Sequence, residues 1–357
     1  MPKIFFKNNV NWKGVSYHLE TKNQIVDLPF DGSFVEVDED ELDENSFIYF
    51  FKGNKKTDKY LIAKKDIGIK YAYNPKIKKN DTYLYNPYLE DIGHVDTFEL
   101  TDEVNLAYRG GKKIINVHVP HNYDPNKKYG LLYFYDSQNL FRNSPKYTAK
   151  NDPYGGWQLD EVLSIYDKDI IIVGIENADD HRMLELTLPV TRKELMNEKE
   201  EEFAKYLTMS CLDKLLNFIH ETVHPFIKNK YSIDEQNIGV GGASCGGIAA
   251  YLTALSYPDI YNYALVYSPA FLFYAKEYFI EFIKNIKSKK LPKLHIYSGF
   301  NDDLEKTIYN STIPMKELMV NLGYPANKIK ETYVKEFMHN EIAWRLILPT
   351  SFDFLLD

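Results

Sequence analysis

The chain has 357 residues, of which 44% are apolar and 26% charged, a balance that excludes a mainly disordered protein. No apolar run reaches the roughly 18 residues of a membrane-spanning helix, and the first residues lack the pattern of a secretory signal. We therefore expect a cytoplasmic protein without a membrane partner. The formal net charge of −8 counts against nucleic-acid binding. Two cysteines, Cys211 and Cys245, cannot form a disulfide framework.

The first 95 residues have the pattern of a small β-rich domain. Short alternating or apolar segments at 33–37, 47–51 and 60–62 are separated by polar breaks, and no helical period is present. We predict a small β-sandwich that resembles an Ig-like domain over residues 1–95. It would precede a larger second domain over residues 96–357.

From about residue 100 onward, apolar strand segments alternate with helical segments. The predicted strands are 114–119, 130–135, 169–175, 238–240, 263–267 and 294–297. The predicted helices are 157–166, 200–230, 246–256, 273–288, 306–322 and 341–356. This alternation predicts an α/β fold with a mostly parallel central sheet and helices on both faces.

The strongest local motif is Gly242-Ala243-Ser244-Cys245-Gly246, which follows a predicted strand and opens a predicted helix. That context indicates a nucleophile elbow, in which a serine sits on a sharp turn above the sheet. Small flanking residues are needed there because the strand and helix backbones approach closely. The helix N-terminus would also stabilise a developing oxyanion. Ser244 is therefore the candidate nucleophile.

A serine hydroxyl needs a general base, and in this fold the acid and then the histidine follow the serine along the chain. His339 comes after an extended segment and directly before the last predicted helix. The acid would lie in the loop that follows strand 294–297, where Asp302 and Asp303 are neighbours. We predict Asp302 as the partner of the imidazole, and Asp303 stays open as the alternative.

A rival motif, His220-Glu221-Thr222-Val223-His224, matches the zinc-protease pattern. Pro225 follows directly and disfavours the α conformation at His224, so we expect a helix end or kink there. The third histidine that extends such a motif is missing from the sequence. We therefore predict no metal site, and a zinc hydrolase stays only as a hypothesis to be tested.

Several stretches in the right order give the chain a resemblance to the Putative esterase family of α/β-hydrolases, which includes enterochelin esterases, feruloyl esterases and S-formylglutathione hydrolase. The matching segments are 135–141, 172–177 with Arg182, 242–247 with 257–258 and 268–271, and 339–341 with Trp344. Ser137 and Cys245 depart from the residues usual in the family. The resemblance covers the chain from about residue 114 to its end.

The resemblance implies a triad of Ser244, Asp302 and His339, with the backbone N–H groups of Gln138 and Cys245 as the oxyanion hole. It implies no cofactor. Trp157 and Arg182 lie in segments that we expect beside the pocket, as candidate substrate-binding residues. A long segment, 178–210, is expected to form a wall or lid of that pocket.

The interpretation that follows is a serine esterase, which cleaves a carboxylic ester through an acyl-enzyme on Ser244. Its partner would be a small-molecule ester. A carbohydrate-linked ester, a siderophore ester and a small thioester stay open. The alternative is a non-catalytic ligand- or carbohydrate-binding protein that keeps the hydrolase fold. The oligomeric state and the role of residues 1–95 stay open as well.

Overall fold

The computed structural model describes residues 3–7, 16–20, 25–28, 34–38, 46–52, 54–56, 60–63, 92–101, 112–141, 156–165, 168–197, 206–288 and 290–356. The strands before residue 92 are β1 (Lys3–Lys7), β2 (Ser16–Glu20), β3 (Ile25–Leu28), β4 (Phe34–Asp38), β5 (Ser46–Lys52), β6 (Lys55–Lys56) and β7 (Tyr60–Ala63). β1 pairs with β4, while β3, β2, β5, β6 and β7 form a separate antiparallel sheet. The predicted Ig-like sandwich depends on segments outside the described residues and stays a prediction, as does its boundary at residue 95.

The rest of the described chain is organised around one eight-stranded sheet. Its strands are β8 (His94–Thr101), β9 (Lys112–Val119), β10 (Tyr129–Tyr135), β11 (Ile170–Ile175), β12 (Ile233–Ala243), β13 (Tyr263–Tyr267), β14 (Lys293–Gly299) and β15 (Ile329–Val334). They lie in the order β15-β14-β13-β12-β10-β11-β9-β8. The six strands from β10 to β15 are parallel, and β9 is antiparallel to both of its neighbours. This is the mostly parallel α/β-hydrolase-like sheet that the sequence predicts.

The central strands are apolar on both faces because helices cover both faces. Every residue of β10, β11 and β13 is buried. By contrast, β8 at the edge alternates between exposed and half-buried residues. This is the contrast expected between a two-sided core strand and an edge strand. On its half-buried side only Phe98 and Leu100 pack against the core, beside the polar Asp96, which explains why the sequence predicted no strand there.

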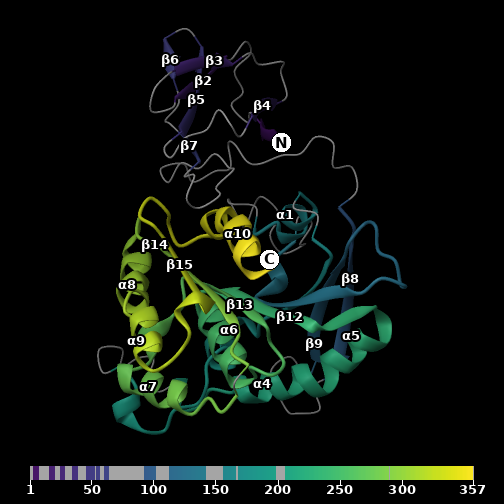
Figure 1. Cartoon of the computed structure of the whole chain (residues 1–357), viewed down its shortest axis with the longest axis vertical. Helices are drawn as coiled ribbons and strands as arrows, with labels where there is room; N and C mark the ends of the chain where they lie inside the picture. The colour runs from purple at the N-terminus through teal and green to yellow at the C-terminus, as the bar shows by residue number, and fades with distance from the viewer. Residues whose placement is uncertain are drawn as a thin grey trace.

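Two groups of helices enclose the sheet (Figure 1). α1 (Leu159–Ile165) and the C-terminal α10 (Glu341–Leu355) lie above it in the view of Figure 1, and α6 (Cys245–Ser256) lies below it. The other α-helices within the described residues are α2 (Arg182–Glu185), α4 (Leu212–Phe218), α5 (His224–Lys230), α7 (Lys276–Lys284), α8 (Asp303–Thr312) and α9 (Met315–Asn321). The predicted helix 306–322 is in fact two, α8 and α9, because Pro314 stands between them.

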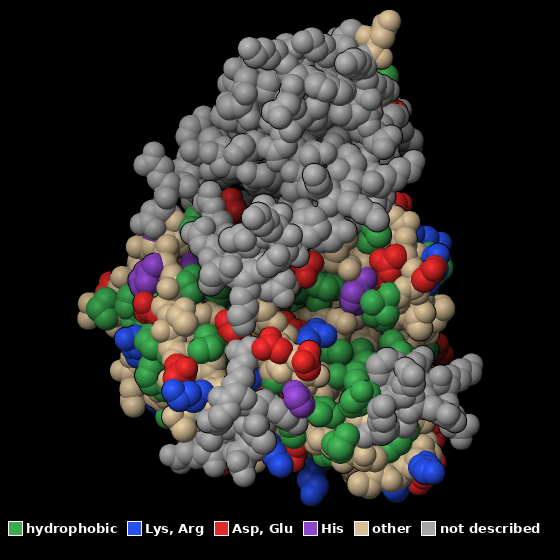
Figure 2. All heavy atoms as spheres, turned by 180° about the vertical axis from the view of Figure 1, so that it is seen from behind, with side chains coloured by type: hydrophobic (Ala, Val, Ile, Leu, Met, Phe, Trp, Pro, Cys, Tyr) green, Lys and Arg blue, Asp and Glu red, His purple; other side chains and the backbone are tan. Residues whose placement is uncertain are grey.

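On the face seen in Figure 2, basic side chains of the described part lie singly or in small groups with acidic ones between them. Such interspersed charge produces no extended field of one sign. Among the helices of the described residues, none combines the length and apolarity needed to cross a bilayer.

Candidate active site

Ser244 sits on a strained turn between β12 and α6, with φ of 59° and ψ of −120°. Its neighbours must be small. A Cβ on Gly242 would lie 2.5 Å from the carbonyl oxygen of Gly246, and one on Gly247 would collide with that of Tyr267. The turn is fixed because the Ser244 N–H donates to the Tyr267 oxygen at 3.0 Å. The sequence motif therefore forms the geometry of a nucleophile elbow.

His339 lies in the loop between β15 and α10, and its side chain is 13% exposed. Its ring Nδ1 is 2.5 Å from Oε2 of Glu305. Phe337 anchors the same loop, because its carbonyl accepts hydrogen bonds from the N–H groups of Phe300 and Asn301. Since an ionised carboxylate can only accept, it places the proton on Nδ1 and leaves Nε2 with a lone pair.

The predicted contact between Asp302 and the imidazole is wrong. Asp302 caps the N-terminus of α8: one carboxylate oxygen accepts from the N–H of Glu305 at 2.8 Å, and the other accepts from the backbone N–H of His339 at 2.6 Å. Asp303, the alternative, is fully exposed and pairs with Lys306. Asp302 thus holds the backbone of the histidine loop, while the side chain that reaches the ring comes from Glu305, one turn further on.

Glu305 has no exposed surface, and its carboxylate is surrounded by donors. Oε1 accepts from the N–H of Gly299 at 2.6 Å and from the hydroxyls of Ser268 at 2.6 Å and Ser298 at 3.0 Å. A buried carboxylate is costly unless it is hydrogen-bonded in this way. These donors and the imidazole provide that compensation for the buried carboxylate.

The loop after β10 faces the elbow and carries the predicted oxyanion donor Gln138. Asp136 has a left-handed φ of 63° and is held by Arg182 through two hydrogen bonds of 2.7 Å. Gln138 lies in the 3₁₀ turn that follows, and Cys245 is the first residue of α6. The N–H groups at these positions have no partner within their own helical turn.

The two departures from the family pattern have local explanations. Ser137 is fully buried: its Cβ lies against Gly174, and its hydroxyl accepts from Asn116 at 3.1 Å. Its side chain therefore does not narrow the cavity that Ser244 and His339 line. Burial raises the pKa of the Cys245 thiol, which therefore stays protonated and is no competing nucleophile.

Ser244 and His339 line one cavity of about 300 Å³, together with Gln138, Trp157 and Arg182. Trp157 is almost fully buried and stacks on Trp344, with ring centroids 5.3 Å apart, so it forms a wall rather than a projecting contact. Arg182 reaches the cavity, but its guanidinium binds Asp136 and the Ala243 carbonyl. Of segment 178–210, Arg182 lines the cavity, whereas 198–205 lie outside the described residues.

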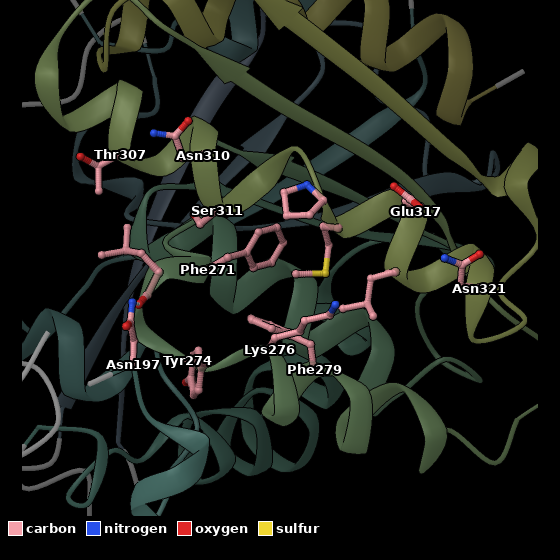
Figure 3. Close-up of a pocket in the computed structure, with 14 residues that line it drawn as sticks. Asn197, Phe271, Tyr274, Lys276, Phe279, Thr307, Asn310, Ser311, Glu317 and Asn321 are labelled. Atoms are coloured by element: carbon pink, nitrogen blue, oxygen red, sulfur yellow. Dashed lines mark hydrogen bonds between the residues drawn. The ribbon is translucent and has the colours of Figure 1, made fainter. Parts of the chain in front are cut away.

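A larger cavity of about 550 Å³ lies elsewhere, between the turn after β13 and helices α7, α8 and α9. Figure 3 shows its aromatic floor, Phe271, Tyr274 and Phe279, below polar side chains of α8 such as Asn310. No histidine or cysteine is among its lining residues. It lacks a nucleophile with a base, so the smaller cavity is the candidate active site.

The rival zinc motif is engaged in packing. His220 hydrogen-bonds through Nε2 to the hydroxyl of Tyr261 at 3.0 Å, and His224 through Nδ1 to that of Tyr133 at 2.8 Å. A π-helical turn, Ile219–Val223, joins α4 to α5, so the helix continues past Pro225 instead of ending. Within the ranges described, no three His, Cys, Asp or Glu side chains are arranged to hold a metal.

The sheet order and the elbow are those of the α/β-hydrolase fold. The sequence matches the family described as "Putative esterase" over residues 108–351, so the chain belongs to this esterase family and is a carboxylic ester hydrolase. No curated protein matches the sequence significantly.

Solved structures share the fold at low sequence identity. An IroE-like serine hydrolase from Shewanella oneidensis is 14% identical, with 72% of this chain and 78% of that chain covered and a TM-score of 0.55. Siderophore hydrolase EstA from Aspergillus nidulans is 18% identical, with 74% and 95% covered and a TM-score of 0.53. A feruloyl esterase module from Clostridium thermocellum, complexed with sinapinate, is 17% identical, with 84% and 96% covered and a TM-score of 0.53.

Proposed function

We propose that the protein is a serine esterase that hydrolyses a small-molecule carboxylic ester through an acyl-enzyme on Ser244. The observation that carries the proposal is the pairing of His339 Nδ1 with the buried carboxylate of Glu305, because His339 lines the same cavity as the elbow serine. That pairing leaves Nε2 of His339 as the base for the Ser244 hydroxyl.

In this mechanism His339 takes the proton of Ser244 as the hydroxyl attacks the ester carbonyl. The N–H groups of Gln138 and Cys245 stabilise the oxyanion of the tetrahedral intermediate. His339 then protonates the departing alcohol, and a water molecule repeats the sequence to release the acid and regenerate Ser244. Glu305 orients the imidazole and stabilises its charged form, and no step requires a cofactor.

The substrate is proposed at the level of class. Two of the similar structures are described as a siderophore hydrolase and a feruloyl esterase, so siderophore-linked and carbohydrate-linked esters are the first to test. Trp157 and Trp344 give the cavity aromatic walls, against which an apolar or aromatic acyl group would pack.

The test combines turnover with covalent labelling. Hydrolysis of p-nitrophenyl acetate and butyrate is compared for the wild type and Ser244→Ala, and the mass is recorded after treatment with a fluorophosphonate. We expect one adduct, on Ser244, and no turnover above background in the variant. A folded wild type with neither turnover nor adduct would instead support a non-catalytic binding protein. Full activity in Ser244→Ala together with sensitivity to a chelator would support the zinc hydrolase.

A further inference from the structure

We propose that Ser268 and Trp344 are positioning residues that hold the Glu305–His339 pair in its catalytic orientation. The proposal rests on the proposed function of that pair. Ser268 directly follows β13, and Trp344 lies in α10. We call them the Ser268–Trp344 relay.

The relay is a directed chain of hydrogen bonds. Nε1 of Trp344 donates to Oγ of Ser268 at 2.9 Å, and Oγ of Ser268 lies 2.6 Å from Oε1 of Glu305. An indole N–H can only donate, so the Ser268 oxygen must accept that bond. The single hydroxyl proton of Ser268 is then directed at the carboxylate, which makes this a charge-assisted bond with a fixed direction.

Trp344 also contacts the base directly. Its ring meets the His339 imidazole edge to face, with centroids 5.0 Å apart and an interplanar angle of 88°. Its other neighbour is Trp157, which stacks on it. Trp344 therefore restrains the imidazole with its ring and the carboxylate, through Ser268, with its N–H. Both members of the pair are fixed by one side chain.

Ser268 keeps an unfavourable backbone conformation at this point. It is fully buried, with a positive φ of 39°, and its N–H donates to the Tyr297 carbonyl at 2.7 Å. Non-glycine residues at positive φ cost free energy and tend to occur where function requires a particular side-chain placement. Here the placement directs a hydroxyl at the orienting acid.

The chemical consequence follows from where the carboxylate charge lies. Donors at Oε1 draw negative charge away from Oε2, which faces the imidazole. Without the Ser268 hydroxyl, Oε2 attracts the Nδ1 proton more strongly, and the protonated imidazole is favoured. The other charged groups around the site are Asp302 at the N-terminus of α8, Glu341 on α10, and Asp136 with Arg182 across the cavity, and we expect them to keep their contacts when the relay is changed.

The test uses Ser268→Ala, Trp344→Phe and the double variant in the full chain. Ser351→Ala is the matched control, because like Ser268→Ala it removes a fully buried hydroxyl. The Ser351 hydroxyl is bonded to a different histidine, His295, at 2.6 Å. We expect kcat to fall about tenfold in Ser268→Ala and less in Trp344→Phe, with KM nearly unchanged. The acid limb of kcat/KM should move to higher pH. The double variant should lose little more than Ser268→Ala alone, because the Trp344 N–H acts through Ser268 and phenylalanine keeps an aromatic ring beside His339.

A second readout does not need turnover. The low-field proton resonance of His339 Nδ1, assigned by its loss in His339→Asn, should move downfield in Ser268→Ala and Trp344→Phe and stay in place in Ser351→Ala. If Ser268→Ala does not fold, Trp344→Phe decides. An unchanged resonance and acid limb in a folded relay variant would overturn the relay. A wild type without Ser244-dependent hydrolysis would overturn the proposed function, and the resonance alone would then decide the relay.

Discussion

His295 and His339 are the last two histidines of the sequence, yet their surroundings give them opposite chemistry. His295 lies within β14, is fully buried, and bonds to two hydroxyls, Ser351 at 2.6 Å and Thr332 at 2.8 Å. Burial, with a smaller contribution from Lys330, lowers the pKa of His295 to about 3. His339 instead has a carboxylate on one nitrogen and lines a cavity. A histidine becomes a usable base through a charged partner and access to substrate, not through hydrogen bonding alone.

The largest expected effect separates these two histidines by function. His339→Ala should lower kcat/KM by about 10⁴-fold or more, because the proposed base is lost. The loss in free energy of unfolding should be smaller than that of His295→Ala, because Glu305 keeps its three donors at Oε1. His295→Ala should do the reverse: it leaves two buried hydroxyls without their partner and costs about 2–4 kcal/mol of stability. Steady-state kinetics measure the activity of both variants, and urea unfolding measures their stability. Similar losses of activity per folded molecule in the two variants would contradict the proposed difference between the two histidines.

A second variant tests the opposite wall of the cavity. Arg182→Ala breaks the two-bond contact that holds Asp136 in the loop before Gln138. We expect kcat to fall about tenfold through misplacement of the oxyanion donor, with KM less affected. Lys127→Ala is the control, since its ion pair with Asp169 is nearly half exposed and contributes little. Kinetics of Arg182→Ala equal to those of Lys127→Ala would show that Arg182 does not position this loop.

The pH dependence of stability sharpens the comparison. The pKa of His295 is about 3 in the folded state, below its ordinary value of about 6.5 when unfolded. Between these values the unfolded chain binds a proton that the folded chain does not. Stability is therefore lost as the pH falls below about 6.5, by up to about 1.4 kcal/mol per pH unit from this group. His118 and His220, whose pKa values burial lowers to about 4, act in the same direction.

His295→Gln should make this decline shallower, as measured by urea unfolding at several pH values from 7 to 4. The variant will be less stable at pH 7, so the slopes are compared rather than the absolute stabilities. A slope identical to that of the wild type would mean that folding does not lower the pKa of His295.

The smallest effect is expected from metal removal. His220 and His224 are bonded to tyrosine hydroxyls, and burial lowers the pKa of both. Dialysis against EDTA should leave both turnover and melting temperature unchanged, with added zinc as the control. Loss of activity on EDTA treatment that zinc restores would return the zinc motif to consideration.

The sheet and the elbow were predictable because their signals are local. Continuous apolar segments indicate strands buried on both faces, and the elbow needs small residues at fixed positions, such as Gly242. The edge strand β8 was missed because only two of its side chains, Phe98 and Leu100, pack against the core, so its apolar signal is short. The pairing of strands before residue 92 as a sandwich stays a prediction.

The orienting acid could not be found by position alone. The rule that the acid follows the strand points to Asp302, the first carboxylate after β14. That carboxylate accepts from backbone N–H groups, since it caps α8. The signal for Glu305 is its place three residues after the cap, where an acid lies in the first helical turn and faces back toward the sheet. Which of the carboxylates turns inward is decided by packing around Ser268 and Gly299, which no local pattern records.

The most direct test of the account compares Glu305→Gln with Asp302→Asn in ester hydrolysis. Glu305→Gln keeps the shape but removes the charge that orients the His339 ring, so kcat should fall by about 10³–10⁴-fold. Asn is also a good helix cap and keeps an acceptor oxygen, so Asp302→Asn should lose less than about tenfold. The larger loss in Glu305→Gln would establish the pair seen in the structure. A larger loss in Asp302→Asn, with Glu305→Gln folded and near wild-type activity, would contradict it.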